Sequence, residues 1–266
     1  AEECSEEVLM SPQRQAELLR GYARAIADES ATLVPVQDRG GGPPRSGVQG
    51  AFDRFLESLQ LEPDGRVSNL PPANATEAEL RAWVVQTQGG NAIELGQNER
   101  SWANRGYPNV KDGRWVNDVR VVVGPGDNPL AALVLAGDTP AITLGNTIFV
   151  DADIYQRYTR GTGDLTATAA GLDLLLHELT HVRQYRDGVL RLVSTVVVQA
   201  GQNPLPNRGS YDYQSRNTTY ATETTEGQAQ MVGNYARFLV DSTFRVRGTS
   251  LTDLQRRLAG TGIFGQ

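Results

Sequence analysis

The feature that most constrains this chain is the short segment His177-Glu178-Leu179-Thr180-His181, which contains the only two histidines among 266 residues. Its pattern is His-Glu-x-x-His. Two histidines four positions apart project from the same side of a helix and can hold one metal ion. Glu178 lies one position round the helix from His177, where its carboxylate can reach a water on that metal without binding the metal itself. The pattern therefore predicts a helix that carries a metal centre and a general base.

A long helix is predicted around this pattern, from a cap at Asp164 or Thr166 to about Asp187. The two histidines and Gln184 lie on one face of it, beside a face of apolar residues that we expect to be buried. A purely structural alternative, in which both histidines form hydrogen bonds within the core, is disfavoured. Burying two imidazoles and a carboxylate together without a cation would cost free energy. The predicted buried stripe consists of Leu172, Leu175, Leu176, Leu179 and Val182.

The absence of other histidines and of a nearby cysteine limits the choice of a third metal ligand. A catalytic zinc ion takes three protein ligands and leaves its fourth position for water. No third histidine exists, and the single cysteine, Cys4, is remote and lies among acidic residues. A carboxylate is therefore expected. We predict Glu226, because it opens a helix predicted over Thr224–Val240, far enough after His181 for the chain to return with a second helix. Glu223 is the alternative.

The face that carries Glu226 contains small side chains. Glu226, Ala229, Gln230 and Gly233 lie on one side of the predicted helix. Ala229 and Gly233 would let this helix approach the histidine-bearing helix closely. If neither glutamate is a ligand, each would simply favour the helix N-terminus, where the helix dipole attracts negative charge.

The remaining sequence divides into a helical and a mixed part. Apolar residues at helical spacing predict helices over residues 11–34 and 48–59, and Thr76 with Glu79 forms a capping box for a helix ending near Gln86. Strands are predicted at Val119–Val123 and within Ala141–Val150. In the second, Gly145-Asn146 indicates a two-residue hairpin turn, with a single bulged strand as the alternative. Helix and strand both remain open for Leu130–Ala136 and Leu190–Ala200, and Leu251–Leu258 is a short amphipathic segment.

The segments around the predicted metal centre resemble those of a known family. The segment from His177 to Tyr185 resembles the zinc helix of gluzincin-type metallopeptidase domains of bacteria, several of which are associated with contractile injection systems and polymorphic toxins. In those domains a stretch similar to Ala141–Ile148 comes before the zinc helix. A tyrosine-bearing loop follows it, then a helix that begins like Glu226–Ala229. The resemblance covers about residues 105–245 and implies that Glu226 is the third ligand. Gln230 departs from it, since related sequences often carry an acid there.

The motifs and the resemblance together predict an α+β fold. Residues 105–248 are expected to form a zincin-like catalytic domain with a small sheet, a zinc helix and a second ligand-bearing helix. A mainly helical N-terminal region, residues 1–104, would precede it, and a tail, residues 249–266, would follow.

The expected function is that of a zinc-dependent endopeptidase with one Zn²⁺ ion and a protein or peptide substrate. Glu178 would act as the general base. Because no histidine remains to stabilise the oxyanion, we expect Tyr213 in this role, with Tyr211, Tyr220 and Arg216 as alternatives. By analogy with zinc peptidases, the segment Ala141–Val150 could pair with an extended substrate. Two other functions stay open: a zinc-binding structural or docking module without catalysis, and a zinc amidase acting on a cell-wall bond.

Composition argues against other classes of protein. The net charge of -6 is unfavourable for a nucleic-acid binder, which needs a basic surface. No apolar stretch approaches the roughly 20 residues that cross a bilayer. One cysteine allows no intramolecular disulfide, and no signal-peptide pattern is present at Ala1-Glu2-Glu3. The cellular compartment is left open, with a secreted or cell-exterior location only weakly favoured.

Overall fold

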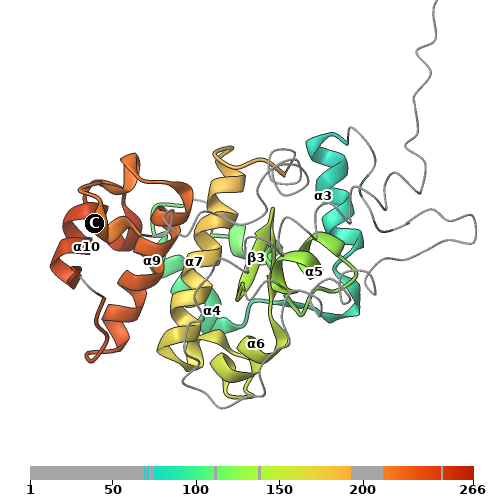
Figure 1. Cartoon of the computed structure of the whole chain (residues 1–266), viewed down its shortest axis with the longest axis horizontal. Coiled ribbons are helices and arrows are strands. Elements are labelled where there is room, and N and C mark those ends of the chain that lie inside the picture. The colour runs from blue at the N-terminus through green and yellow to red at the C-terminus, as the bar shows by residue number, and fades with distance from the viewer. Residues whose placement is uncertain are drawn as a thin grey trace, which may run out of the picture.

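The computed structural model describes residues 69, 71, 75–110, 113–136, 139–192, 212–246 and 248–266. Within these residues the fold is mixed α+β, as predicted, with seven α-helices and one four-stranded sheet (Figure 1). Several features predicted from the sequence lie outside the described residues. These are Cys4, the two N-terminal helices at residues 11–34 and 48–59, residues 193–200 of the undecided segment, and Tyr211.

The four strands form a mixed sheet in the order β1-β2-β4-β3. The parallel pair is β2 with β4, and the other two pairs are antiparallel. The predicted hairpin is confirmed: Leu144 lies opposite Thr147, and Gly145 makes the turn with a φ of 63°, which glycine adopts without strain. The alternative of one bulged strand is wrong. The strands are β1 Ala92–Glu94, β2 Arg120–Val123, β3 Ala141–Leu144 and β4 Thr147–Val150.

Most of the predicted helices are present. Thr76 and Glu79 exchange the two hydrogen bonds of the capping box at the start of α3, and Thr224 caps α9. The undecided segment Leu130–Ala136 is helical, while α4 and α6 were not predicted. The helices are α3 Glu77–Gln86, α4 Gln97–Gly106, α5 Pro129–Ala136, α6 Ala152–Thr159, α7 Ala169–Arg186, α9 Thr225–Val240 and α10 Leu251–Leu258.

The start of α7 differs from the prediction, which placed its cap at Asp164 or Thr166. Asp164 instead caps a short 3₁₀ helix, Leu165–Ala167, by accepting a hydrogen bond from the Thr166 N–H at 2.8 Å. Helix α7 begins at Ala169, with Thr168 as its N-cap. A capping residue can start any helix. Asp164 and Thr168 therefore start two separate helices, and the second helix, α7, carries the histidines.

The hydrophobic core includes segments from both sides of the predicted domain. Residue 104 lies inside α4, and β1, before it in the chain, pairs with β2. Leu95 and Ala103 belong to the same buried cluster as Leu175 of α7, as do Leu254 and Leu258 of α10. Thus segments that were assigned to the N-terminal region and to the tail contribute to the core around α7. All five residues of the predicted apolar stripe of α7 are buried.

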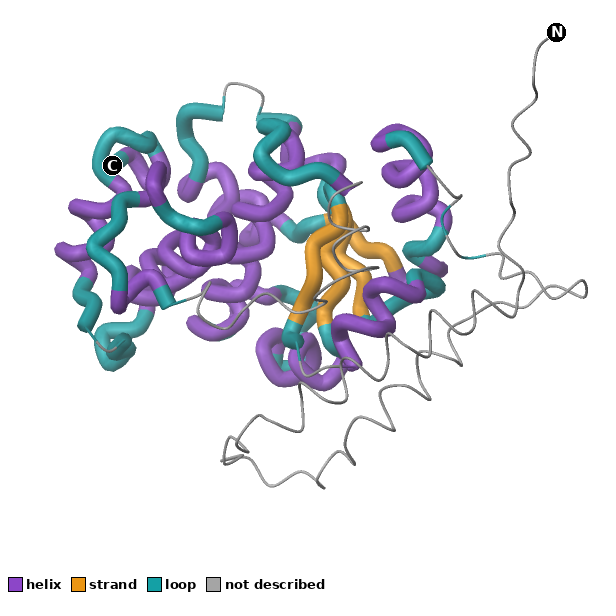
Figure 2. The backbone as a smooth tube through the Cα atoms, turned by 45° about the horizontal axis from the view of Figure 1, so that its top comes forward, coloured by secondary structure: helices purple, strands orange, loops and turns teal. Residues whose placement is uncertain are grey.

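Helix α7 is the central element of the fold. It lies between β3 and α9 (Figure 1), and Figure 2 shows the strands grouped beside the helices from a second direction. Gly233 allows the close contact between α7 and α9, because a Cβ there would lie 2.3 Å from Asp173 Oδ1 and 2.7 Å from the Asp173 carbonyl oxygen. The prediction of a close approach is confirmed at this position. At Gly227, by contrast, a Cβ would collide with the side chain of Glu223. This glycine therefore makes room for the loop that leads into α9.

The packing at Gly233 can be tested by substitution. We expect Gly233→Ala to lower the free energy of unfolding by about 1–3 kcal/mol, because the added methyl must push α9 away from the backbone of α7. Chemical denaturation measures this loss. Gly113→Ala is the matched control, since a Cβ at Gly113 has no neighbour within 4 Å. Unchanged stability of Gly233→Ala would show that the two helices can separate without cost.

Candidate metal centre

Three predicted ligands meet at one point between α7 and α9. The Nε2 atoms of His177 and His181 are 3.2 Å apart, and Glu226 Oε2 lies 3.2 Å from His181 Nε2 and 3.5 Å from His177 Nε2. Zinc bonds of about 2.0–2.2 Å in tetrahedral geometry place ligand atoms roughly 3.3 Å from one another. The triangle therefore has the dimensions of three corners of a tetrahedral metal site. Among the described residues these three form the group that could hold a metal ion.

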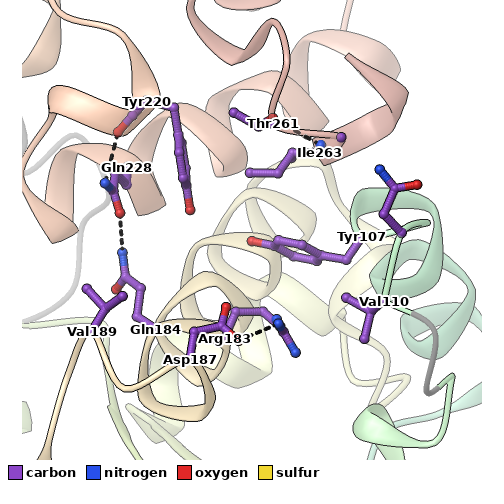
Figure 3. Close-up of a pocket in the computed structure, with 12 residues that line it drawn as sticks. Tyr107, Val110, Arg183, Gln184, Asp187, Val189, Tyr220, Gln228, Thr261 and Ile263 are labelled. Carbon is purple, nitrogen blue, oxygen red and sulfur yellow. Dashed lines mark hydrogen bonds and ion pairs between the residues drawn. The ribbon is translucent and has the colours of Figure 1, made fainter.

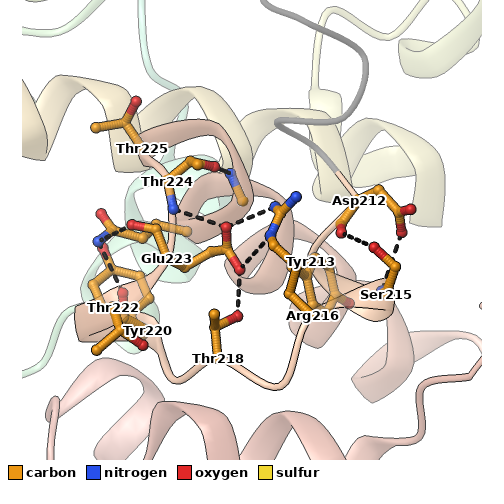
Figure 4. A network of polar contacts seen from close by, with 12 residues as sticks. Asp212, Tyr213, Ser215, Arg216, Thr218, Tyr220, Thr222, Glu223, Thr224 and Thr225 are labelled. Carbon is orange, nitrogen blue, oxygen red and sulfur yellow. Dashed lines mark hydrogen bonds and ion pairs between the residues drawn. The ribbon is translucent and has the colours of Figure 1, made fainter.

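Glu223, the alternative ligand, is held elsewhere. Its buried carboxylate accepts hydrogen bonds from Arg216, at 2.6 Å, from the hydroxyl of Thr218, and from the backbone N–H of Thr224 (Figure 4). Burial alone would raise the pKa of this carboxyl, but the hydrogen bonds and the charge of Arg216 lower it. Glu223 therefore fixes the loop that leads into α9, and in this way it positions Glu226.

The tautomer of His181 follows from a chain of two glutamines. Gln228 donates from its Nε2 to the carbonyl oxygens of Tyr220 and Glu223, so its Oε1 is the atom that faces Gln184 (Figure 3). Gln184 donates to that oxygen at 2.9 Å, and its own Oε1 lies 2.8 Å from His181 Nδ1. Because carbonyl oxygens only accept hydrogen bonds, both amide orientations are fixed, and Nδ1 of His181 must carry the proton.

In the neutral ring of His181 the other nitrogen, Nε2, then carries a lone pair. This lone pair faces Glu226 Oε2 and His177 Nε2 at 3.2 Å each. Electron-pair donors in a buried site repel one another unless a cation lies between them. Both rings are less than one tenth exposed, so water does not screen this repulsion. The arrangement thus fits a metal ion, which would take the place of a proton.

Without a metal, a proton supplies the positive charge. Burial lowers the pKa of His181, but the charge of Glu226 and the hydrogen bonds to Glu226 and Gln184 outweigh burial and raise it to about 9. Burial likewise raises the pKa of Glu226, but the charge and hydrogen bonds of the two histidines hold it far below its usual range. The metal-free centre is therefore an ion pair at neutral pH.

Glu178 lies beside the metal-ligand triangle. Its Oε2 accepts a hydrogen bond from the hydroxyl of Thr143 on β3 at 2.7 Å, and no described residue contacts Oε1 within hydrogen-bonding distance. Together with His177, Glu178 lines a cavity of about 260 Å³, and Ala141, Gln230 and Arg237 also line it. One carboxylate oxygen is thus fixed, while the other is available next to a space that a ligand could enter.

Three of the residues predicted to stabilise an oxyanion are described by the structure, and none of these three lines this cavity. Tyr213 is fully buried, and its hydroxyl accepts a hydrogen bond from Asn234 at 2.9 Å. Arg216 is paired with Glu223. Tyr220 lines a separate cavity of about 560 Å³, which Gln184 also lines (Figure 3). The structure therefore does not bring Tyr213 to Glu178, because the ring of Tyr213 packs in the hydrophobic core.

Several residues of the centre were not identified from the sequence. Gln184 stands three positions after His181, a spacing that places side chains together on a helix, so its role could have been inferred. Thr143 and Gln228 depend on long-range packing and left no such signal. Gln230, which departs from the acid of related sequences, donates to Asn234 at 3.0 Å and, among the described residues, forms no hydrogen bond with a candidate ligand.

Comparison with known proteins connects part of this centre to a family. A model described as the eCIS core domain, for extracellular contractile injection system, matches residues 112–189. The match covers less than a third of the chain; it includes β2 to α7, with both histidines and Glu178, and ends before Glu226. It agrees with the predicted link to contractile injection systems, but its description mentions neither zinc nor peptide hydrolysis. No curated protein and no solved structure matches the chain. No described helix is long and apolar enough to cross a membrane.

The raised pKa of His181 predicts how the stability of the metal-free protein depends on pH. The charged imidazole stabilises the fold fully below 6.5, the ordinary histidine value, and this contribution is lost as the pH rises through about 9. Denaturation of chelator-treated protein over this window should show falling stability. His181→Asn, which does not titrate there, should lack this component. A wild-type protein that gains stability over the same window would contradict the assignment.

The role of Gln184 predicts the effect of its removal on metal binding. Gln184→Leu should weaken zinc binding about 10- to 100-fold, because Nδ1 of His181 loses the acceptor that fixes its tautomer. Competition with a chromogenic chelator measures the affinity. Gln230→Leu is the matched control, since Gln230 bonds to Asn234 and to no ligand. Equal affinity of the Gln184 variant and the control would remove Gln184 from the centre.

Proposed function

We propose that the protein is a zinc-dependent endopeptidase with a zincin-like arrangement of the metal-bearing helices. The observation that carries this proposal is the triangle of His177, His181 and Glu226 beside Glu178 and a cavity. Structural zinc sites have four protein ligands, whereas catalytic sites have three and an open position. The described residues supply three. When bound, zinc would lower the pKa of a water molecule and polarise the scissile carbonyl.

In this proposal, Glu178 transfers the proton. The hydroxyl of Thr143 fixes Oε2 of Glu178, so Oε1 accepts the proton from the attacking water and later delivers it to the leaving amine. Tyr158 replaces Tyr213 as the proposed hydrogen-bond donor to the oxyanion, because it is the tyrosine that lines the cavity with Glu178.

A peptide substrate is favoured by the position of β3. Among the described strands it lies at the edge of the sheet, with β4 as its partner. The other edge of such a strand presents N–H and C=O groups to which an extended peptide can pair. Ala141 at the start of β3 lines the cavity, and Thr143 contacts Glu178. A substrate strand added to β3 would thus pass beside the catalytic base. This favours a peptide over the cell-wall bond of a zinc amidase.

The match to the eCIS core domain supports a second candidate function. The protein could dock on a contractile injection particle, with residues 112–189 as the docking part and the metal as a structural element. This function needs neither a free oxygen on Glu178 nor an open coordination position. One protein can both dock and hydrolyse a substrate, so a measurement of hydrolysis does not decide whether the protein docks.

The proposed catalytic base can be tested with a conservative variant. Glu178→Gln should bind one zinc ion per chain, as the wild type does, but hydrolyse a protein substrate about 10²- to 10⁴-fold more slowly, because the amide cannot accept the proton. Zinc content and cleavage of an unfolded protein substrate are the measurements. Glu94→Gln on β1, which pairs with Arg100 and Arg120, is the control. Equal cleavage by both variants would exclude Glu178 as the base.

A further inference from the structure

The cavity beside Glu178 contains a second pair of charges that the proposed reaction does not use. Asp173 lies one helical turn before His177 on α7, and Arg237 comes from α9. The Arg237 Nη1 and Asp173 Oδ2 atoms are 3.5 Å apart, and both residues line the cavity together with His177 and Glu178. The cavity therefore extends from the metal ligands to a guanidinium group.

Arg237 uses few of the hydrogen-bond donors of its guanidinium group. The Arg237 guanidinium has five N–H donors, yet among the described residues it makes one hydrogen bond, the long contact to Asp173. Its Nε is buried and has no partner there, and the Phe244 ring covers the group at 4.1 Å. A buried donor without a partner costs free energy. Arg237 therefore keeps donors that an acceptor in the cavity could use.

The cation is the accessible member of the pair. The Arg237 side chain is 30% exposed and the Asp173 side chain 14%. Asp173 is packed against Gly233, where even a Cβ would collide with its Oδ1. A ligand that enters the cavity therefore meets the guanidinium before the carboxylate. Guanidinium groups bind carboxylates through two parallel hydrogen bonds, which are about twice as strong as bonds between neutral groups.

We propose that Arg237 is a specificity-determining residue that binds a carboxylate of the substrate next to the bond that is cut. The inference rests on the proposed peptidase function and deepens it by naming the class of substrate. The cavity of about 260 Å³ is smaller than the roughly 300–1,000 Å³ that holds a drug-sized ligand, so it suits one side chain. That carboxylate belongs either to an acidic side chain or to the C-terminus of a short peptide. Asp173 acts as a positioning residue that orients Arg237 from behind.

Binding of peptide hydroxamates to the zinc-loaded full chain tests this without turnover. Each compound ligates the metal through its hydroxamate and carries Glu, Gln or Lys at the adjacent position, with the C-terminus free or amidated. Calorimetry should show the Glu compound binding at least about tenfold tighter than the Gln compound, a difference of about 1.4 kcal/mol. A preference for the free over the amidated C-terminus, without a preference for Glu, would identify the terminal carboxylate as the ligand.

Variants of Arg237 test substrate selection separately from the proposed peptidase function. Arg237→Gln should bind the Glu and Gln compounds equally while keeping its affinity for the Gln compound. If that variant is unstable because Asp173 loses its partner, the double variant Asp173→Asn, Arg237→Gln contains no unpaired charge and should give the same result. Arg245→Gln is the matched control, since Arg245 is exposed and bonds to neighbouring backbone carbonyls.

Two results would overturn the inference, and they differ in what they imply for the proposed peptidase function. If the wild type binds all compounds equally, or if Arg237→Gln retains the preference for a carboxylate, then Arg237 does not select the substrate, and the peptidase function is untouched. If no hydroxamate binds to the zinc-loaded protein, the metal has no open position. The proposed function then fails together with the inference.

Discussion

Two helices bring two imidazoles and a carboxylate into contact, and this contact needs a positive charge at its centre, either a proton or a metal ion. Nε2 of His177, Nε2 of His181 and Oε2 of Glu226 lie within 3.5 Å of each other. Gly233 lets α9 approach α7 closely, and the two glutamines keep the lone pair of His181 pointed at its neighbours. These features hold the donor atoms around one point, where a proton supplies the positive charge in the metal-free protein and a metal ion would take its place.

The two halves of the centre are positioned by different means. Helix α7 fixes both histidines by its own geometry, since residues four apart share a face. Glu226 depends instead on the loop before α9, which Glu223 and Arg216 tie together. Arg257 of α10 supports the same loop: it is buried, pairs with Asp253, and donates to the carbonyl oxygens of Tyr213, Arg216 and Thr218. The C-terminal segment, which was predicted to be a tail, therefore supports the loop that leads to the candidate ligand Glu226.

The sequence predicted those parts of the centre that depend on local spacing or on elimination. The histidine pair and Glu178 follow from one helical turn. A carboxylate followed because no histidine or nearby cysteine remained, and Glu226 was preferred to Glu223 for its place in the first turn of a later helix and from the family resemblance. Tyr213 was misplaced because the composition of its loop does not tell which tyrosines face the core. Strand β1 is three residues long and its side chains are half-buried or exposed, so it left no alternating pattern. Thr143 reaches Glu178 only through the packing of β3 on α7, which no local pattern contains.

The family match covers only part of the candidate centre. The matched residues, 112–189, contain two of the candidate ligands, the proposed base Glu178 and the threonine that bonds to it, whereas Glu226 and Arg237 lie beyond them on α9. Two imidazoles on one helix can bind a metal, but the third ligand decides how many positions stay open. Related chains that share the matched segment could therefore differ in their metal chemistry. In this chain α9 supplies both the carboxylate that completes the triangle and the guanidinium at the far end of the cavity. On this argument, catalysis and substrate selection would depend on one helix outside the matched segment.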